Sequence, residues 1–151
     1  MRSLLLLLLL VIGCALSAQK PSRTRSNMDK AAIEKQQKEE LFKTLIKDMM
    51  AAYNEGRYLQ VAQYYHDDAI VSGGTTFVEG RDALDNYWED FFSIGGKWEL
   101  KIDWERHYEN YVVQRGTSVI QQRNGEKSEV QFFLHWTRKE GEWKIAQDIY
   151  W

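Results

Sequence analysis

The sequence predicts one α+β domain, in which three N-terminal helices pack on a curved antiparallel sheet of four long strands plus a short β-pair. Two observations carry this prediction. Apolar residues in the first half recur with the helical period, whereas those in the second half alternate as in strands. A chain of 151 residues has room for one domain. Segregated helices and strands are typical of α+β folds, with the helices on one face of the sheet.

The first helix is expected from Met28 to about Asn54 because its second half has apolar residues at helical spacing. These residues are Phe42, Leu45, Ile46, Met49, Ala52 and Tyr53. Residues 28–40 have almost no apolar face, so we expect an exposed helical extension there. A second helix is predicted from Tyr58 to His66, and a third after Gly80.

The strands are predicted from alternation and from turn signals between them. Residues 69–72 and 75–79 form a short pair around a double glycine. The four long strands are expected at residues 98–107, 111–123, 129–138 and 143–151. Asn124-Gly125 and Glu140-Gly141 would make the last two hairpin turns.

The N-terminus has the three-part layout of a cleavable secretory signal at residues 1–18, which predicts a secreted protein. A short basic start precedes an apolar run, and small residues follow. The apolar run is shorter than the roughly 20 residues of a membrane-spanning helix, so no membrane span is expected. An alternative is lipid anchoring at Cys14, if the chain is bacterial. Residues 19–27 are predicted to be a flexible lead-in to a domain of residues 28–151.

Composition excludes several function classes. The chain has 20 basic and 22 acidic residues, so it lacks the basic excess that binds nucleic acid. Cys14 is the only cysteine, so the mature domain cannot use disulfides and must depend on its 6 Trp, 8 Tyr and 6 Phe for a core. No phosphate-binding loop or nucleophile motif is present, and we expect no cofactor.

A metal site at His66-Asp67-Asp68 is also not expected. Adjacent side chains at a turn point in different directions, and no distant residue completes a ligand set. We therefore interpret Asp67 and Asp68 as solvated turn residues.

Three separated motifs resemble a known superfamily over roughly residues 41–151. They are AAYNEGRYLQVAQYYHDDAIV, FVEGRDALDNYW and LHWTRKEGEWKIAQDIYW. They are similar to the superfamily of nuclear transport factor two, ketosteroid isomerase and the SnoaL-like polyketide cyclases, most of all to the SnoaL-like domain of unknown function numbered 4440. The resemblance implies a cone-shaped fold with an internal cavity. It implies no single function, because this fold serves enzymes, carriers and dimerisation modules.

The resemblance also implies which residues line the cavity. Met49 and Tyr53 of the first helix, Tyr65 of the second and Trp88 of the third would form part of its wall.

Ketosteroid isomerase uses an aspartate base, a tyrosine donor and a protonated aspartic acid donor, and the resemblance carries these three positions onto Gly73, Met49 and Phe133 respectively. None of these residues can transfer a proton, so the resemblance argues against that isomerase arrangement.

The pairing register of the last hairpin can be predicted from the position of its turn. With a two-residue turn at Glu140-Gly141, one face would carry mixed residues: Gln131, Phe133, His135, Ala146, Asp148 and Tyr150. The other face would be almost wholly apolar: Val130, Phe132, Leu134, Trp136, Trp143, Ile145, Ile149 and Trp151. We expect the mixed face to line the cavity, with Phe133 and Tyr150 as ligand-binding residues, and the apolar face to form a homodimer. The alternative is that the apolar face packs under the helices as core.

On this register His135 and Asp148 would lie about one diagonal step apart, which makes them a candidate catalytic acid/base pair. The alternative is that they only satisfy each other's polar groups. We therefore expect a secreted domain with an apolar pocket, which binds a small hydrophobic ligand or acts as a dimerisation module. The alternative function is an enzyme of isomerase, cyclase or hydratase type that acts on a hydrophobic molecule through Asp148 and His135.

Overall fold

The computed structural model describes residues 23–151. The predicted signal peptide at residues 1–18 and the alternative lipid-anchor residue Cys14 lie outside the described residues. The chain divides into two compact units at Lys35. All tertiary structure discussed below belongs to the second unit, residues 36–151.

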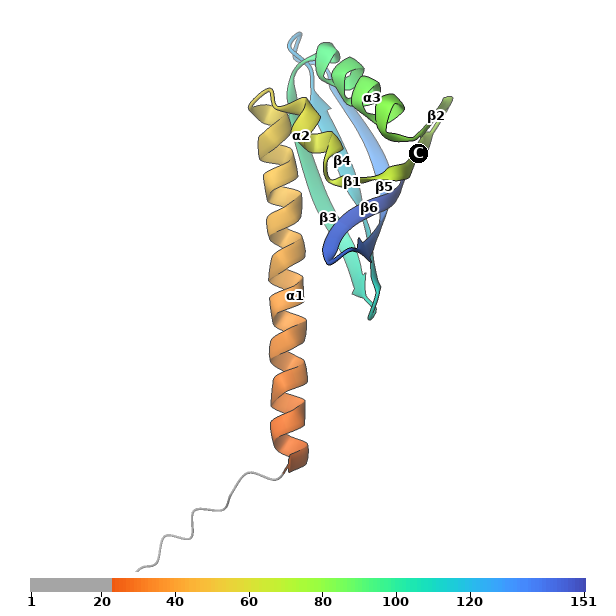
Figure 1. The fold of residues 1–151 in the computed structure, drawn as a ribbon. Helices are drawn as coiled ribbons and strands as arrows, with labels where there is room; N and C mark the ends of the chain where they lie inside the picture. The colour runs from red at the N-terminus through yellow and green to blue at the C-terminus, as the bar shows by residue number, and fades with distance from the viewer. Residues whose placement is uncertain (1–22) are drawn as a thin grey trace, which may run out of the picture. The chain divides into compact units, whose positions relative to one another are not determined.

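Three helices precede or interrupt the sheet (Figure 1), namely α1 (Arg23–Asn54), α2 (Tyr58–Ala62) and α3 (Arg81–Ile94). The first helix begins at Arg23, so residues 23–27 of the predicted lead-in are helical. The predicted extension at residues 28–40 is exposed except at Lys38 and Glu39, which are half-buried. Gly56 follows α1 with a φ of 82°, a left-handed conformation that ends helices at little cost when the residue is glycine.

The second helix is shorter than predicted. Tyr65 and His66 belong to a strand, in which Tyr65 pairs with Ile145. Arg81 donates hydrogen bonds to the carbonyl oxygens of Ala62 and Tyr65, at 2.8 Å each, and so satisfies backbone groups where helix gives way to strand. Apolar spacing over so short a segment does not separate a helix from a buried strand.

Six strands form one mixed sheet. They are β1 (Tyr65–Gly73), β2 (Thr76–Glu79), β3 (Lys97–His107), β4 (Tyr111–Gln121), β5 (Lys127–Lys139) and β6 (Glu142–Tyr150). Their order is β2-β1-β6-β5-β4-β3. The four long strands pair antiparallel as predicted. The short β-pair joins the same sheet, because β1 runs parallel to β6.

The helices cover one face of this sheet, and the core lies between the two layers. α3 packs on β1 and β2 and beside α2 (Figure 1). From α1, Phe42 reaches the sheet and meets Trp136 and Trp143 edge-on, with ring centroids 5.4 and 5.3 Å apart. Trp136 and Ile145 are fully buried there. The prediction that this apolar face of the last hairpin turns outward onto a second copy was therefore wrong for most of its residues, which form the core as the alternative had it, whereas Ile149 and Trp151 are exposed.

A β-bulge in the last hairpin explains a second correction. Pairing starts as predicted, with Thr137 opposite Lys144, but the register shifts between His135 and Trp136. Trp136 lies opposite Ile145 and His135 opposite Gln147, which leaves Ala146 as the extra residue. Beyond the bulge, Asp148 and Tyr150 therefore share a face with Leu134 and Phe132, and not with His135 and Phe133 as predicted.

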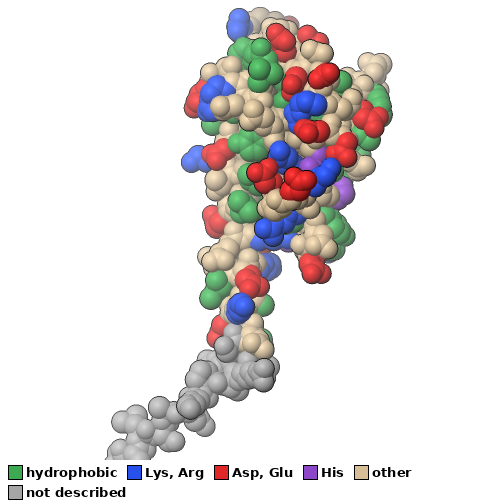
Figure 2. Space-filling model, in the orientation of Figure 1, with side chains coloured by type: hydrophobic (Ala, Val, Ile, Leu, Met, Phe, Trp, Pro, Cys, Tyr) green, Lys and Arg blue, Asp and Glu red, His purple; other side chains and the backbone are tan. Residues whose placement is uncertain are grey.

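Polar side chains on the surface are mixed in sign. In the view of Figure 2, acidic and basic groups are interspersed over the domain rather than gathered by charge. Within residues 23–151 no helix combines the length and apolarity needed to cross a membrane.

Candidate functional site

A cavity of about 540 Å³ opens between α3 and the inner face of the sheet. Its wall is mainly apolar and aromatic, and the polar groups are few. The lining residues are Met49, Tyr65, Thr76, Tyr87, Trp88, Asp90, Phe91, Ser93, Ile94, Trp98, Leu100, Ser118, Ile120, Ser128, Val130, Phe132, Leu134, Asp148 and Tyr150. An apolar hollow of this size with a few convergent polar groups is the usual form of a small-molecule site.

Asp148 contributes a half-buried carboxyl group to this wall. β6 presents it to the cavity because the bulge at Ala146 turns its side chain to the helix-covered face. The hydroxyl of Tyr65 donates a 2.7 Å hydrogen bond to Asp148 Oδ2. Burial raises the pKa of Asp148 to about 6, and the hydrogen bond from Tyr65 opposes that rise. The carboxyl group therefore titrates close to neutral pH.

Tyrosine hydroxyls border the carboxylate. Burial and the charge of Asp148 raise the pKa of Tyr65 well above its ordinary value. Burial, Asp148 and a hydrogen bond with Tyr150 also raise the pKa of Tyr87. The phenols around Asp148 are therefore neutral hydrogen-bonding groups at physiological pH.

Trp88 supplies a donor that the protein leaves unused. Its side chain is only 2% exposed, yet its indole Nε1 has no hydrogen-bond partner among the described residues. The other cavity tryptophan differs, because Trp98 Nε1 donates to Ser118 Oγ at 2.9 Å. Buried N–H groups without an acceptor are rare, so the N–H of Trp88 is available to an acceptor held in the cavity.

Some of the residues predicted for the cavity do line it. Met49, Tyr65, Trp88 and Tyr150 are all in its wall. Tyr53 is not, because it lies behind the wall, where its hydroxyl donates to the Phe91 carbonyl at 3.2 Å. Its ring packs against Trp98, with centroids 5.3 Å apart.

The predicted His135–Asp148 pair does not form. His135 lies opposite Gln147, whereas Asp148 lies opposite Leu134, so the two side chains point to different faces of the sheet. His135 instead meets the ring of Tyr111 edge-on at 5.6 Å. Phe133 also points outward, between Arg115 and Ile149, so its placement at the cavity was wrong.

The apolar part of the wall that β5 provides was not predicted from the sequence. Val130, Phe132 and Leu134 line the cavity, although they were assigned to the outward face. Tyr87 was not among the predicted ligand-binding residues either, although it comes one residue before Trp88 on the apolar side of the third helix.

Close packing shapes one end of the cavity. A Cβ atom built on Gly73 would lie 2.4 Å from Tyr150 Cδ2 and from the Tyr150 carbonyl oxygen. Only glycine lets β1 approach β6 this closely, and the Tyr150 ring occupies the space that a side chain at Gly73 would need.

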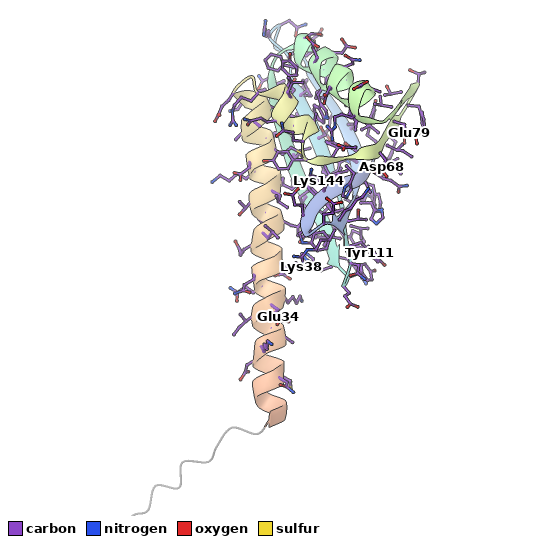
Figure 3. All side chains as sticks on the ribbon, in the orientation of Figure 1. Glu34, Lys38, Asp68, Glu79, Tyr111 and Lys144 are labelled. Atoms are coloured by element: carbon purple, nitrogen blue, oxygen red, sulfur yellow. The ribbon has the colours of Figure 1, made fainter. Side chains whose placement is uncertain are left out.

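The predicted turn residues at the other end of β1 have structural partners. Asp67 and Asp68 are exposed (Asp68 is labelled in Figure 3), and Asp67 forms an ion pair with Arg81 at 3.0 Å. His66 Nε2 lies 2.9 Å from Thr137 Oγ1. Within the described part of the chain, no group of three or more His, Cys, Asp or Glu residues could hold a metal ion.

Comparison with known proteins identifies the family. The family model of the SnoaL-like domain matches residues 46–146, which is most of the domain described above. The chain belongs to the SnoaL-like domain family. No match was found among curated proteins.

Solved structures share the fold of this SnoaL-like domain at low sequence identity. An NTF2-like protein with a cystatin-like fold from Novosphingobium aromaticivorans is 14% identical, with a TM-score of 0.69 over 80% of this chain and 85% of that chain. An NTF-2 like protein from Shewanella oneidensis is 16% identical, with a TM-score of 0.66 over 72% of this chain and 94% of that chain. Likeness at this level shows the fold, not the function.

Proposed function

We propose that this SnoaL-like domain binds a small, largely apolar molecule in the cavity around Asp148. The observation that carries the proposal is an aromatic hollow of about 540 Å³ that holds a protonatable carboxyl group and the unpaired N–H of Trp88. The apolar wall would supply most of the binding free energy, and the few polar groups would orient the ligand.

A cavity-filling variant tests this proposal. Ile120 is buried in the cavity wall, whereas its neighbour Val119 points to the other face of β4. We expect the neutral fluorophore N-phenylnaphthylamine to bind the wild-type protein and Val119→Trp, but not Ile120→Trp. Equal fluorescence enhancement by all three proteins would contradict the proposal, provided that circular dichroism shows each to be folded.

A second candidate function is proton transfer to a bound hydrophobic compound. It is supported by the raised pKa of Asp148 inside a largely apolar cavity, where the ionised carboxylate is a stronger base than in water. Asp148 takes this role alone, because His135 lies on the other face of the sheet.

Deuterium exchange tests the catalytic candidate directly. We expect the wild-type protein to catalyse exchange at the carbons next to the carbonyl group of small hydrophobic ketones, with a rate that rises as pH passes through about 6. Asp148→Asn should reduce this rate at least about 100-fold, the lower range for removal of a general base. Proton NMR in D₂O measures it, and an exchange rate equal to that of buffer would reject this candidate while leaving ligand binding intact.

We further propose that the domain forms a homodimer through the uncovered face of its sheet. Across four neighbouring strands, this face places Ile149, Phe133, Arg115 and Trp104 in one continuous row. Trp151 follows, 58% exposed, with the Arg115 guanidinium 5.7 Å from its ring centroid. Contiguous exposed aromatic surface of this kind favours association.

The site of action is proposed from the sequence alone. The secretory layout of residues 1–18 supports an exported mature domain, with lipid anchoring at Cys14 as the alternative. Mass spectrometry of the protein from its own source would report the cleavage site and any lipid.

A further inference from the structure

The cavity contains negative charge without a matching positive charge. Asp148 and Asp90 are its two carboxyl groups, and among the described residues no Lys, Arg or His side chain lines it. Asp148 accepts its hydrogen bond from the neutral phenol of Tyr65. Above pH 6 the site therefore carries a partly desolvated carboxylate that no cationic side chain in the cavity wall formed by residues 23–151 compensates.

The same cavity is rich in aromatic faces. Trp88 is the centre of this cluster, with ring centroids 5.3 Å from Tyr87, 5.3 Å from Phe91, 5.3 Å from Trp98 and 5.8 Å from Tyr65. The faces of Trp and Tyr rings carry negative electrostatic potential and attract organic cations, most strongly when water is excluded. The aromatic rings and the Asp148 carboxylate therefore both favour binding of a cation.

We propose that the cavity selects organic ammonium compounds, meaning hydrophobic molecules that carry a protonated or quaternary amine, over neutral and anionic molecules of the same size. The ammonium group lies at Asp148 among the phenols of Tyr65, Tyr87 and Tyr150, and the apolar body lies against the apolar part of the wall that β5 provides. The N–H of Trp88 is left for an acceptor atom elsewhere on the same ligand. This inference rests on the proposed ligand-binding function and narrows it to one chemical class.

The charge balance predicts a pH dependence of binding. The side chains facing Asp148 are the phenols of Tyr65 from β1, Tyr87 from α3 and Tyr150 from β6, and Asp90 lies on the α3 side of the cavity. Burial raises the pKa of Asp148 into this range, to about 6, whereas the pKa values of Tyr65 and Tyr87 are raised away from it. Protonation of Asp148 at pH 5 leaves roughly a tenth of the sites charged, so the affinity for an amine should fall about tenfold between pH 7.5 and pH 5.

A matched set of probes tests the selectivity. Naphthylmethylamine, naphthalenemethanol and naphthylacetate share one aromatic body and differ in charge. By isothermal titration at pH 7.5 we expect the amine to bind about tenfold more tightly than the alcohol, and the acetate more weakly than either. Asp148→Asn should remove the preference for the amine, because the amide side chain keeps an acceptor for Tyr65 but not the charge. Asp68→Asn makes the same change at an exposed position of β1 and should preserve the preference.

The outcomes separate this inference from the function on which it rests. If none of the probes bind, and N-phenylnaphthylamine also fails to bind, the ligand-binding function itself is rejected. If the alcohol or the acetate binds as tightly as the amine, or if Asp148→Asn keeps the preference for the amine, the cation proposal is overturned while ligand binding stands. Loss of the preference in Asp68→Asn as well would also overturn it, because the effect would then reflect net charge.

Discussion

Asp148 should make the domain less stable at neutral pH. Its folded-state pKa of about 6 lies above the ordinary value of 3.8, so the folded state binds this proton more tightly than the unfolded state does. The stabilisation by the neutral carboxyl group is complete below about pH 4 and is lost as pH rises through about 6. A shift of this size corresponds to roughly 3 kcal/mol.

Asp148→Asn should therefore be more stable than the wild type at pH 7.5, by up to about 3 kcal/mol, with the difference shrinking toward pH 4. The expected gain comes from removing a desolvated charge while an acceptor for Tyr65 is retained. Urea denaturation at the two pH values measures it. A variant that is equally or less stable at pH 7.5, with the same pH dependence as the wild type, would contradict the raised pKa.

Gly73 should tolerate no side chain, because Tyr150 already occupies the space. We expect Gly73→Ala to lower the free energy of unfolding by about 1–3 kcal/mol, the usual range for an overpacked contact, and to displace the Tyr150 ring. Ser72→Ala, at the adjacent position, is the control and should change stability by less than about 1 kcal/mol. A stable Gly73→Ala protein with unchanged ligand affinity would contradict the close contact.

At the scale of residues, the sequence predicted which side chains line the cavity better than it predicted which side chains contact one another. Met49, Tyr65 and Trp88 could be placed at a cavity from the resemblance alone, whereas Tyr150 was placed there through a hairpin register that the bulge changes. The neighbours of Asp148 could not, because they depend on which face of β6 it occupies.

At the scale of the elements, the bulge at Ala146 decides the composition of the site. Strict alternation from the Glu140-Gly141 turn puts Asp148 on the outer face, but one extra residue reverses every side chain beyond it. No local signal marks this bulge, since Ala146 is neither Gly nor Pro. It is set by tertiary packing, in which Trp136 and Ile145 stay buried in the core while Asp148 and Tyr150 also face inward.

The buried stripe of α1 can be tested against its exposed neighbour. Phe42 is fully buried against Trp136, Trp143 and His107, whereas Leu41 is 41% exposed. Phe42→Ala should cost about 3–5 kcal/mol, because it leaves a cavity under the helix. Leu41→Ala should cost less than about 1 kcal/mol by the same chemical denaturation. Similar costs for the two would mean that α1 presents a different side to the sheet.

For the whole molecule, the fold class and the four-stranded antiparallel order followed from periodicity and turn residues. The parallel contact of β1 with β6 did not, because it joins segments far apart in the chain and leaves no local pattern. Family membership follows from motifs spread along the chain. The choice of ligand depends on the cavity side chains, which differ among proteins that share this fold.

The row of Ile149, Phe133, Arg115 and Trp104 on the uncovered face of the sheet predicts a dimer, which one introduced positive charge should disrupt. Phe133→Arg places a cation in the row beside Arg115, and we expect it to convert a dimer into a monomer in sedimentation velocity. Phe77→Arg is the matched control, since Phe77 is 67% exposed on β2, outside that row, and should leave the dimer intact. A monomeric wild-type protein at micromolar concentration would reject this interface.

The place of β6 between β1 and β5 has a consequence for how the domain acquires its structure. The last strand in chain order joins the first hairpin of the sheet to the three-stranded meander, so neither half can dock until β6 is present. Strand pairing between segments far apart in the chain forms slowly, because the long intervening loop loses conformational entropy before the pairing contacts can stabilise it. The first hairpin and the meander of a newly made chain should therefore stay unjoined until β6 has been made.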